Sequence, residues 1–144
     1  MSASPNQLNT LHIGLINCRS ICNKTPEILE LIKDFDIDLC GITESWLKKA
    51  DSAKIAEIKE LGYETDSKPR AGRGGGVAFL YKSFLKYKPK KSTRYKSFEC
   101  IESSIILQEG SHLWMACVYR SGTSALSTNI ALFFQEFDKY LCSL

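Results

Sequence analysis

Short apolar runs that each end in a polar residue form the main pattern of this chain. The runs cover 11–17, 37–44 and 113–119, and they end in Asn17, Glu44 and Tyr119. Runs of this length predict buried strands. In an open α/β sheet, functional side chains gather at the carboxyl ends of core strands, because the strands are rigid and their ends meet water. An amide, a carboxylate and a phenol at such ends predict a site for an oxyanion or a divalent cation.

Three segments have the periodicity of amphipathic helices. The first starts at Thr25-Pro26, where we expect Thr25 to supply a capping oxygen and Pro26 to occupy the first helical position. We expect Ser52 to cap a second, shorter helix that ends at Gly62. The third helix is the last element, and one face of it carries Ile130, Phe133, Phe134, Phe137 and Leu141.

Further strands are predicted between the second and third helices. They lie near 63–65 and across 77–81, and a turn at 108–111 joins two more, at 102–107 and 113–119, into a hairpin. The chain thus alternates strands and helices, continues with consecutive strands and ends on a helix. This order predicts an α/β fold in which helices pack on sheets.

Basic residues are concentrated in one part of the chain. The net charge is +3, but no Asp or Glu occurs in 67–98, which holds ten of the 19 Lys and Arg residues. Tyr81, Tyr87 and Tyr95 are interleaved with them, which favours nucleic-acid binding through charge and stacking. A solvated loop and strand face is the alternative interpretation of the same run.

Composition and cysteine usage indicate the number of domains and the cellular compartment that we expect. A length of 144 residues suits one domain, and no apolar run reaches the roughly 20 residues that span a bilayer. The first residues lack the basic and apolar regions of a signal peptide, so we expect an intracellular protein, nuclear or cytoplasmic and not secreted. The six cysteines show no zinc-site spacing and are expected to be free thiols, with Cys40, Cys100 and Cys117 in apolar runs.

Each candidate residue also has a structural interpretation. Glu44 could bind Mg²⁺, which takes oxygen ligands and often one or two carboxylates, or it could be a surface residue at a strand end. Asn17 could orient a phosphate oxygen or occupy a turn, and Tyr119 could donate to phosphate or pack at a strand end. The glycine run 72–76 lacks the pattern of a phosphate-binding loop and predicts a turn into a strand. Neither His12 nor His112 adjoins a nucleophile, and we expect both to be structural or exposed.

Four motifs in order resemble those of the endonuclease domain of LINE-type (non-LTR) retrotransposons. They are Leu15-Ile16-Asn17-Cys18-Arg19-Ser20-Ile21 with Asn23-Lys24, then Ile42-Thr43-Glu44-Ser45-Trp46-Leu47, then Arg70-Ala71-Gly72-Arg73-Gly74-Gly75-Gly76-Val77-Ala78, and Val118-Tyr119-Arg120. That family belongs to the endonuclease/exonuclease/phosphatase superfamily, with DNase I. The resemblance implies a four-layer α/β sandwich of the DNase I-like kind.

The resemblance also implies Mg²⁺-dependent (or Mn²⁺-dependent) hydrolysis of a DNA phosphodiester. Glu44 is the expected metal ligand, Asn17 would arrange metal and phosphate, and Tyr119 would contact the phosphate, so these three are the expected catalytic residues. DNA is the expected partner, with no membrane and no small-molecule cofactor. The expected DNA-binding residues are basic ones in or near the motifs and in the basic run: Arg19, Arg70, Arg73, Lys88, Lys90, Lys91, Arg94 and Arg120.

Two departures from the family pattern shape the expected function. Ser121-Gly122 follows Tyr119-Arg120 where the family usually has proline, and the later Gly-Asp-Phe-Asn and Ser-Asp-His motifs do not occur. We therefore expect 1–10 to be a disordered lead and 11–144 to be the N-terminal part of the domain, truncated after the helix that ends near Leu144. Such a part would be inactive alone and would self-associate through uncovered sheet. The alternative is a non-catalytic nucleic-acid-binding remnant that uses 67–98.

Overall fold

The computed structural model describes residues 10–48, 50–70, 74–91, 93–122 and 126–144, with only the backbone described for 126–129. The expected lead, apart from Thr10, lies outside the described residues. In chain order the elements are β1 (Ile13–Asn17), α1 (Thr25–Asp34), β2 (Leu39–Thr43), α2 (Ser52–Glu60), β3 (Tyr63–Lys68), β4 (Val77–Lys82), β5 (Tyr87–Lys90), β6 (Glu99–Ile106), β7 (His112–Tyr119) and α3 (Leu126–Cys142).

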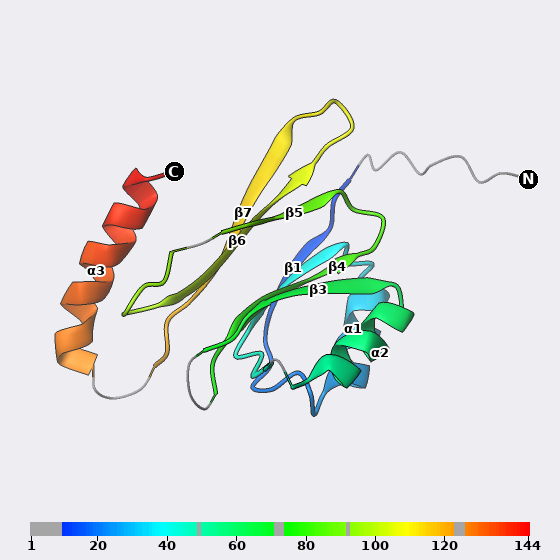
Figure 1. The fold of residues 1–144 in the computed structure, drawn as a ribbon, viewed down its shortest axis with the longest axis horizontal. Helices are drawn as coiled ribbons and strands as arrows, with labels where there is room; N and C mark the ends of the chain where they lie inside the picture. Colours follow the sequence, from blue (N-terminus) through cyan, green and yellow to red (C-terminus); the bar gives the residue numbers. More distant parts are fainter. Residues whose placement is uncertain (1–9, 49, 71–73, 92, 123–125) are drawn as a thin grey trace, which may run out of the picture.

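The strands form two sheets that pack face to face (Figure 1). The first has the order β1-β2-β4-β3, and only its β1–β2 pair is parallel. The second has the order β5-β6-β7 and is antiparallel, with the predicted hairpin between β6 and β7. In the β1–β2 register Asn17 lies opposite Thr43, so the residues that follow β1 and β2 leave the sheet at the same end.

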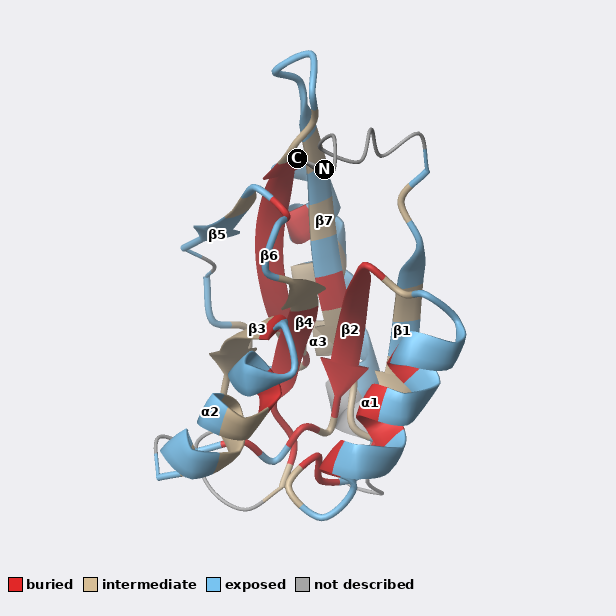
Figure 2. Ribbon diagram, turned by 90° about the vertical axis from the view of Figure 1, so that its right-hand side faces the viewer, coloured by how far each residue is buried: buried red, intermediate tan, exposed pale blue. Residues whose placement is uncertain are grey.

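Alternation along the central strands produces two separate cores, because successive side chains of a strand point to opposite faces. On β2, Cys40 and Ile42 pack under α1 and α2, while Leu39 packs between the sheets. On β4, Leu80 faces the helices and Phe79 faces the second sheet. Figure 2 shows β2 buried along its whole length. A strand with both faces covered is mostly apolar, and β2 is apolar from Leu39 to Ile42, with Thr43 as its one buried polar residue.

A third core attaches α3 to the outer face of the second sheet. Phe98 and Cys100 are buried there against Phe133, Phe137 and Tyr140. The Phe98 ring meets the Phe133 and Phe137 rings edge to face, with centroid distances of 5.8 Å each. The layers therefore run from α1 and α2 through two sheets to α3, which confirms the four-layer α/β architecture.

The buried face of α3 differs from the one we expected. Phe133 and Phe137 pack inward as predicted, but Ile130, Phe134 and Leu141 are 43%, 65% and 50% exposed. Tyr140 is buried instead and reaches the Glu102 carboxylate with its hydroxyl. The aromatic residues on this helix span more than one face, and the position of Phe98 on the sheet side decides which of them is covered.

Both predicted capping residues are wrong by one position. Thr25 is the first residue of α1, and its hydroxyl donates to the Ile21 carbonyl oxygen at 2.8 Å. Ser52 likewise begins α2, and Asp51 is the residue before it. The Asp51 carboxylate accepts from the Lys48 backbone N–H at 2.8 Å and so closes the preceding turn rather than the helix.

Strand β5 was not predicted, because it is short, basic and contains Pro89. Proline lacks a backbone donor and is confined to edge strands, and β5 is an edge of the second sheet. Within the described part of the chain, no strand pairs with the outer side of β1 in the first sheet or of β7 in the second. Ile13 and Leu15 of β1 are 55% and 71% exposed and line a groove of about 430 Å³ beside β7.

All six cysteines are free, as predicted, and Cys40, Cys100 and Cys117 are buried. Burial raises the pKa of the Cys40 thiol to about 12 and that of Cys117 to about 11, so both stay protonated and behave as small apolar groups. Among the described residues, no helix combines the length and apolar character needed to cross a membrane.

The Glu136 carboxylate ties α3 to the turn before β6. It accepts from the backbone N–H groups of Lys96 and Ser97 and from the Ser97 hydroxyl. Burial alone would raise the pKa of Glu136, but these hydrogen bonds outweigh it and lower the pKa below its ordinary value. A lowered folded-state pKa stabilises the fold above the unfolded pKa, and this contribution is lost as pH falls through the folded value.

Glu136→Gln is therefore expected to cost roughly 1 to 2 kcal/mol of unfolding free energy at pH 7. The difference from the wild type should shrink below about pH 4.3, the ordinary pKa of glutamate. Urea unfolding at pH 7 and below pH 4 measures both values. Glu30→Gln, at an exposed position on α1, is the control and should change little at either pH. A cost for Glu136→Gln that does not depend on pH would contradict this role.

Candidate functional site

Two loops at one end of the first sheet hold Glu44 in place. The backbone N–H of Cys18 donates to the Thr43 carbonyl at 3.1 Å, and that of Ser20 donates to the Glu44 carbonyl at 2.8 Å. The loop after β1 thus continues the parallel pairing into the loop after β2. Both loops contain non-glycine residues at positive φ, including Arg19 at 47° and Glu44 at 53°. Such backbone is unfavourable by about 1 to 3 kcal/mol per residue and is often found at functional sites.

Asn17, Glu44 and Tyr119 meet at one carboxylate oxygen. The Asn17 amide Nδ2 lies 3.4 Å from Glu44 Oε1, and the Tyr119 hydroxyl donates to the same oxygen. Asn17 ends β1 of the first sheet, whereas Tyr119 ends β7 of the second. The packing of the two sheets therefore brings together three strand-end residues that are far apart in the sequence.

The Glu44 carboxyl is held in its charged form. The hydrogen bond from Tyr119 is the largest cause that lowers the pKa of Glu44, and Asn17 and Arg19 act in the same direction. Burial raises the pKa of the Tyr119 hydroxyl, and its bond to Glu44 raises it further, so the phenol remains a donor. At neutral pH the site presents a carboxylate, an amide and a protonated phenol.

A glycine turn supports the Glu44 loop from the other side. The N–H groups of Ser45 and Trp46 donate to the carbonyls of Gly76 and Gly75, at 3.1 and 2.9 Å. Gly76 has a φ of 87°, and a Cβ there would lie 2.8 Å from the Ser45 hydroxyl oxygen. The turn leads into β4 as predicted, but its role as a support for Glu44 was not anticipated.

Glu99, which the sequence did not single out, fastens this turn to the second sheet. Its Oε1 accepts from the Gly76 N–H at 2.8 Å, and its Oε2 pairs with Arg70 Nη2 at 2.9 Å. Glu99 lies opposite Tyr119 in the β6–β7 register. The sequence did contain a signal for this role. Glu99 is the first carboxylate after the basic run and begins a strand, so it is placed to neutralise a nearby cation.

The donor set fits one side of a divalent cation site. Within the described part of the chain, no three His, Cys, Asp or Glu side chains cluster as a complete metal site. Glu44 supplies one carboxylate and Asn17 one amide beside it. Mg²⁺ commonly binds through one or two carboxylates and keeps several waters, so these residues suit it without enclosing it.

The expected DNA-binding residues are divided between paired and unpaired positions. Arg70 pairs with Glu99, Lys90 pairs with Glu102 at 3.2 Å, and Arg19 Nε lies 3.9 Å from Glu44 Oε2. Lys88, Lys91 and Arg94 are exposed and have no carboxylate within ion-pair distance among the described residues. Arg73 lies outside the described residues.

Arg120 is a separate case. Its guanidinium lies 5.4 Å from the centre of the Phe133 ring, between β7 and α3. Its Nε and Nη2 atoms are buried, and neither has a hydrogen-bond partner among the described residues. The group is therefore held by ring contact at the edge of the site rather than displayed on the surface.

The tyrosines of the basic run belong to internal packing. Tyr81 and Tyr87 stack with centroids 3.9 Å apart, and the Tyr87 hydroxyl donates to Asp66 at 2.7 Å. Tyr95 stacks on Phe98 at 4.3 Å. Tyr81 and Tyr87 pack inward from β4 and β5, and Tyr95 packs from the segment before β6, so the three tyrosines do not by themselves form a stacking platform for bases.

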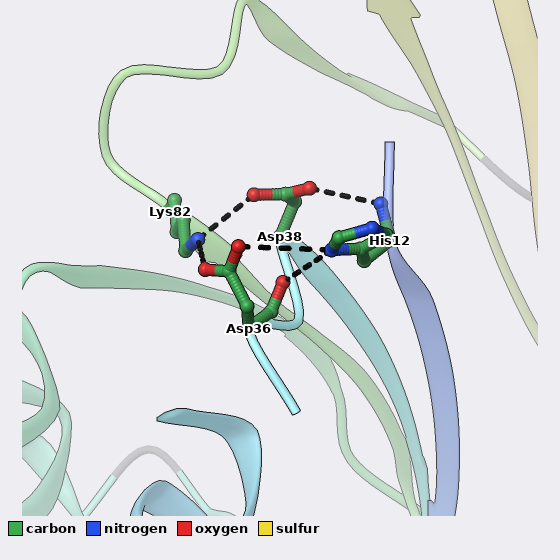
Figure 3. Close-up of polar contacts among 4 residues, drawn as sticks. All are labelled: His12, Asp36, Asp38 and Lys82. Atoms are coloured by element: carbon green, nitrogen blue, oxygen red, sulfur yellow. Dashed lines mark hydrogen bonds and ion pairs between the residues drawn. The ribbon is translucent and has the colours of Figure 1, made fainter. Parts of the chain in front are cut away.

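Both histidines lie away from Glu44, at the opposite ends of their strands. His12 precedes β1 and contacts Asp36, as Figure 3 shows, and its backbone N–H donates to Asp38 at 2.8 Å. His112 begins β7, and its Nδ1 lies 3.3 Å from the Ser104 hydroxyl. These positions agree with the structural roles expected for them.

Similar folds occur among solved structures. No family model matches the chain, and no curated protein matches it. TDP2 from D. rerio, complexed with single strand DNA product, gives a TM-score of 0.59 at 10% identity over 89% of this chain and 54% of its own. The human Nocturnin catalytic domain with bound sulfate anion gives 0.51 at 17% identity, over 69% and 44%.

A third solved structure is less similar. The 3' phosphatase NExo from Neisseria, bound to product DNA hairpin, gives 0.49 at 16% identity over 73% of this chain and 40% of its own. The chain thus spans about half the length of the solved structures it matches. The likeness to TDP2 and Nocturnin shows the fold: this chain has the DNase I-like α/β architecture.

Proposed function

We propose that this chain forms one side of a metal-dependent phosphodiesterase site that acts on DNA, as in the LINE-type endonucleases whose motifs it resembles. The observation that carries the proposal is the meeting of Asn17 and Tyr119 on Glu44 Oε1, from two different sheets. Such convergence has no evident packing benefit, since Asn17 is exposed and Glu44 is only partly buried. The DNase I-like fold and its DNA-bound neighbour TDP2 support a nucleic-acid substrate.

Each residue would have a distinct role. Glu44 would hold a Mg²⁺ or Mn²⁺ ion through its carboxylate, and Asn17 would orient a bound water or a phosphate oxygen. A cation bound there would stabilise negative charge on the reacting phosphate. The Tyr119 hydroxyl, whose pKa is raised, would remain protonated and donate to a phosphate oxygen. Arg19 is 80% exposed in its side chain and would neutralise the phosphate charge from solvent.

The described residues supply no positioned base beside Glu44, because His12 and His112 lie at the far ends of β1 and β7. A positioned proton acceptor typically contributes 10²–10⁴-fold to rate. We therefore expect this chain alone to nick supercoiled plasmid in Mg²⁺ no faster than its Glu44→Gln variant. Nicking that Glu44→Gln abolishes would overturn this expectation of inactivity.

Metal binding tests the proposed site without relying on activity. Mn²⁺ should broaden the amide NMR signals of 17–20 and 43–46 and that of Tyr119, because a paramagnetic ion acts on nuclei near it. Glu44→Gln is expected to weaken this binding at least about tenfold, since it removes the carboxylate that attracts the ion. Glu109→Gln, which changes an exposed carboxylate in the β6–β7 turn, is the control and should leave the broadening unchanged. Equal broadening in all three proteins would reject the site.

A further inference from the structure

A small pocket with an excess of positive charge lies near the Glu44 site. It has a volume of about 200 Å³ and lies between the end of β3 and the segment that leads into β6. Its charged lining consists of Lys68, Arg70 and Arg94 against the one carboxylate of Glu99. Three cations facing one anion leave an excess of two positive charges around a small, partly enclosed space.

Hydrogen bonds to two backbone carbonyls hold the Lys68 ammonium group in the wall of this pocket. Its Nζ donates to the carbonyls of Thr93 and Cys100, at 3.1 and 3.0 Å. Burial lowers the pKa of Lys68 below its ordinary value, and Arg94 acts in the same direction. Lys68 and Arg94 thus line the same pocket and repel each other, an arrangement that an anion would stabilise.

Arg70 connects the pocket to the Glu44 site. Its guanidinium lies over Gly75, where a Cβ would come within 2.3 Å of Nε, so the glycine allows this close approach. Glu99 already uses both oxygens, one for Arg70 and one for the Gly76 N–H, which limits how far it can neutralise the other cations. Glu99 holds the Gly76 N–H next to the Glu44 loop, and the positive charge of Arg70 helps to lower the pKa of Glu44 and partly opposes the rise in the pKa of Tyr119, so the pocket and the carboxylate are neighbours.

We propose that the pocket between Lys68, Arg70 and Arg94 binds a phosphate group of a nucleic-acid strand, next to the phosphodiester held at Glu44. The class of ligand follows from the lining, because guanidinium groups recognise phosphate through paired N–H donors and lysine adds a point charge. The pocket is too small for a folded partner and suits one phosphate group. This inference rests on the proposed function for the identity of the strand, but the pocket can be tested separately.

Arg94 is the residue to replace. It is exposed, and none of the described carboxylates pairs with it, so Arg94→Gln should leave the fold intact. Lys33→Gln, which removes one exposed positive charge on α1, is the matched control. The probes are inorganic phosphate and a short single-stranded DNA with a 5′-phosphate, titrated at several salt concentrations.

The expected result has three parts. DNA should shift the amide signals of 94–100 and bind at least tenfold more tightly than inorganic phosphate, which should displace it. Arg94→Gln should weaken DNA binding about tenfold and reduce the slope of log affinity against log salt by about 1, whereas Lys33→Gln should not. Glu44→Gln should lose Mn²⁺ binding and keep the DNA-induced shifts at 94–100, which separates this pocket from the metal site.

Two outcomes would overturn the proposal. If Arg94→Gln and Lys33→Gln weaken DNA binding equally, the attraction comes from net charge and not from the pocket. If inorganic phosphate binds as tightly as the DNA, the pocket takes free anions and not a strand. If Mn²⁺ does not bind at Glu44 but the expected DNA-binding results are obtained, the proposed function is rejected and the phosphate pocket is retained.

Discussion

Replacing Lys82 by methionine is expected to lower the free energy of unfolding by about 3 kcal/mol, because it leaves a buried carboxylate without its cation. Lys82 Nζ lies 2.9 Å from Asp38 Oδ1 and 2.6 Å from Asp36 Oδ1, as Figure 3 shows. The Asp38 side chain is 4% exposed, whereas that of Asp36 is 73% exposed. The cost therefore comes from Asp38, since water can solvate Asp36 after the substitution.

The Lys82–Asp38 ion pair also connects three strands, at the end of the first sheet that lies opposite Glu44. Asp38 precedes β2, Lys82 ends β4, and the second Asp38 oxygen accepts from the His12 backbone N–H beside β1. Burial alone would lower the pKa of Lys82, but its bonds to Asp36 and Asp38 raise it above its ordinary value. A raised folded-state pKa stabilises the fold below the unfolded pKa, so this contribution is lost at strongly alkaline pH.

A double-mutant cycle with Asp38→Asn tests the cause of the Lys82 effect. Asparagine keeps an acceptor for His12 and removes the buried charge. Lys82→Met should then cost about 1 kcal/mol or less in the Asp38→Asn background. Denaturant unfolding of the four proteins at pH 7 measures the coupling. A cost that is the same in both backgrounds would show that the effect comes from lost packing of the lysine stem.

Gly76→Ala should also destabilise the fold by about 3 kcal/mol and should disturb the Glu44 loop. A φ of 87° is unfavourable for alanine by about 1 to 2 kcal/mol. The added Cβ would lie 2.8 Å from the hydroxyl oxygen of the fully buried Ser45, so one of the two must move, at a further cost of about 1 to 3 kcal/mol. Ser45 follows Glu44 directly, so the movement should displace the carboxylate from Tyr119.

Gly110→Ala provides a matched control for Gly76→Ala. Gly110 has a φ of 84°, but nothing lies within 4 Å of its Cβ position, so alanine there carries only the backbone cost of about 1 to 2 kcal/mol. Thermal unfolding compares the two stabilities, and Mn²⁺ broadening reports on Glu44. Equal destabilisation by both variants, with Mn²⁺ binding unchanged, would mean that the contact with Ser45 does not hold the site.

Local pattern was sufficient for most elements of the fold. The apolar runs that end in Asn17, Glu44 and Tyr119 are strands, and the helical periodicities correspond to α1, α2 and α3. Periodicity depends on near neighbours, so it predicts an element without knowledge of its surroundings. Periodicity failed where tertiary contacts decide the structure. It missed β5, an edge strand that contains proline, and it placed Phe134 on the buried face of α3, whereas Phe98 of the sheet side covers other rings of that helix.

The charge pattern shows a similar division. The basic run 67–98 contains no acidic residue, yet several of its cations are neutralised by carboxylates from other segments. Glu99 and Glu102 of β6 pair with Arg70 and Lys90, and the carboxylates before β2 pair with Lys82. Sheet pairing determines these contacts, and a linear count of charge cannot represent them. Lys88, Lys91 and Arg94, which pair with no carboxylate among the described residues, form a smaller cationic surface than the basic run as a whole.

By itself, the sequence determined the order of the helices and of every strand except β5, the free cysteines and the polar residues at three strand ends. It could do so because alternation, helical period and residue chemistry are local properties. Only the tertiary structure decided that Tyr119 reaches Glu44 across 75 residues, that Gly76 and Glu99 support the loop between them, and that Lys68, Arg70 and Arg94 line one pocket. These contacts depend on how two sheets pack face to face, which is fixed by the sum of many burials and not by any one segment.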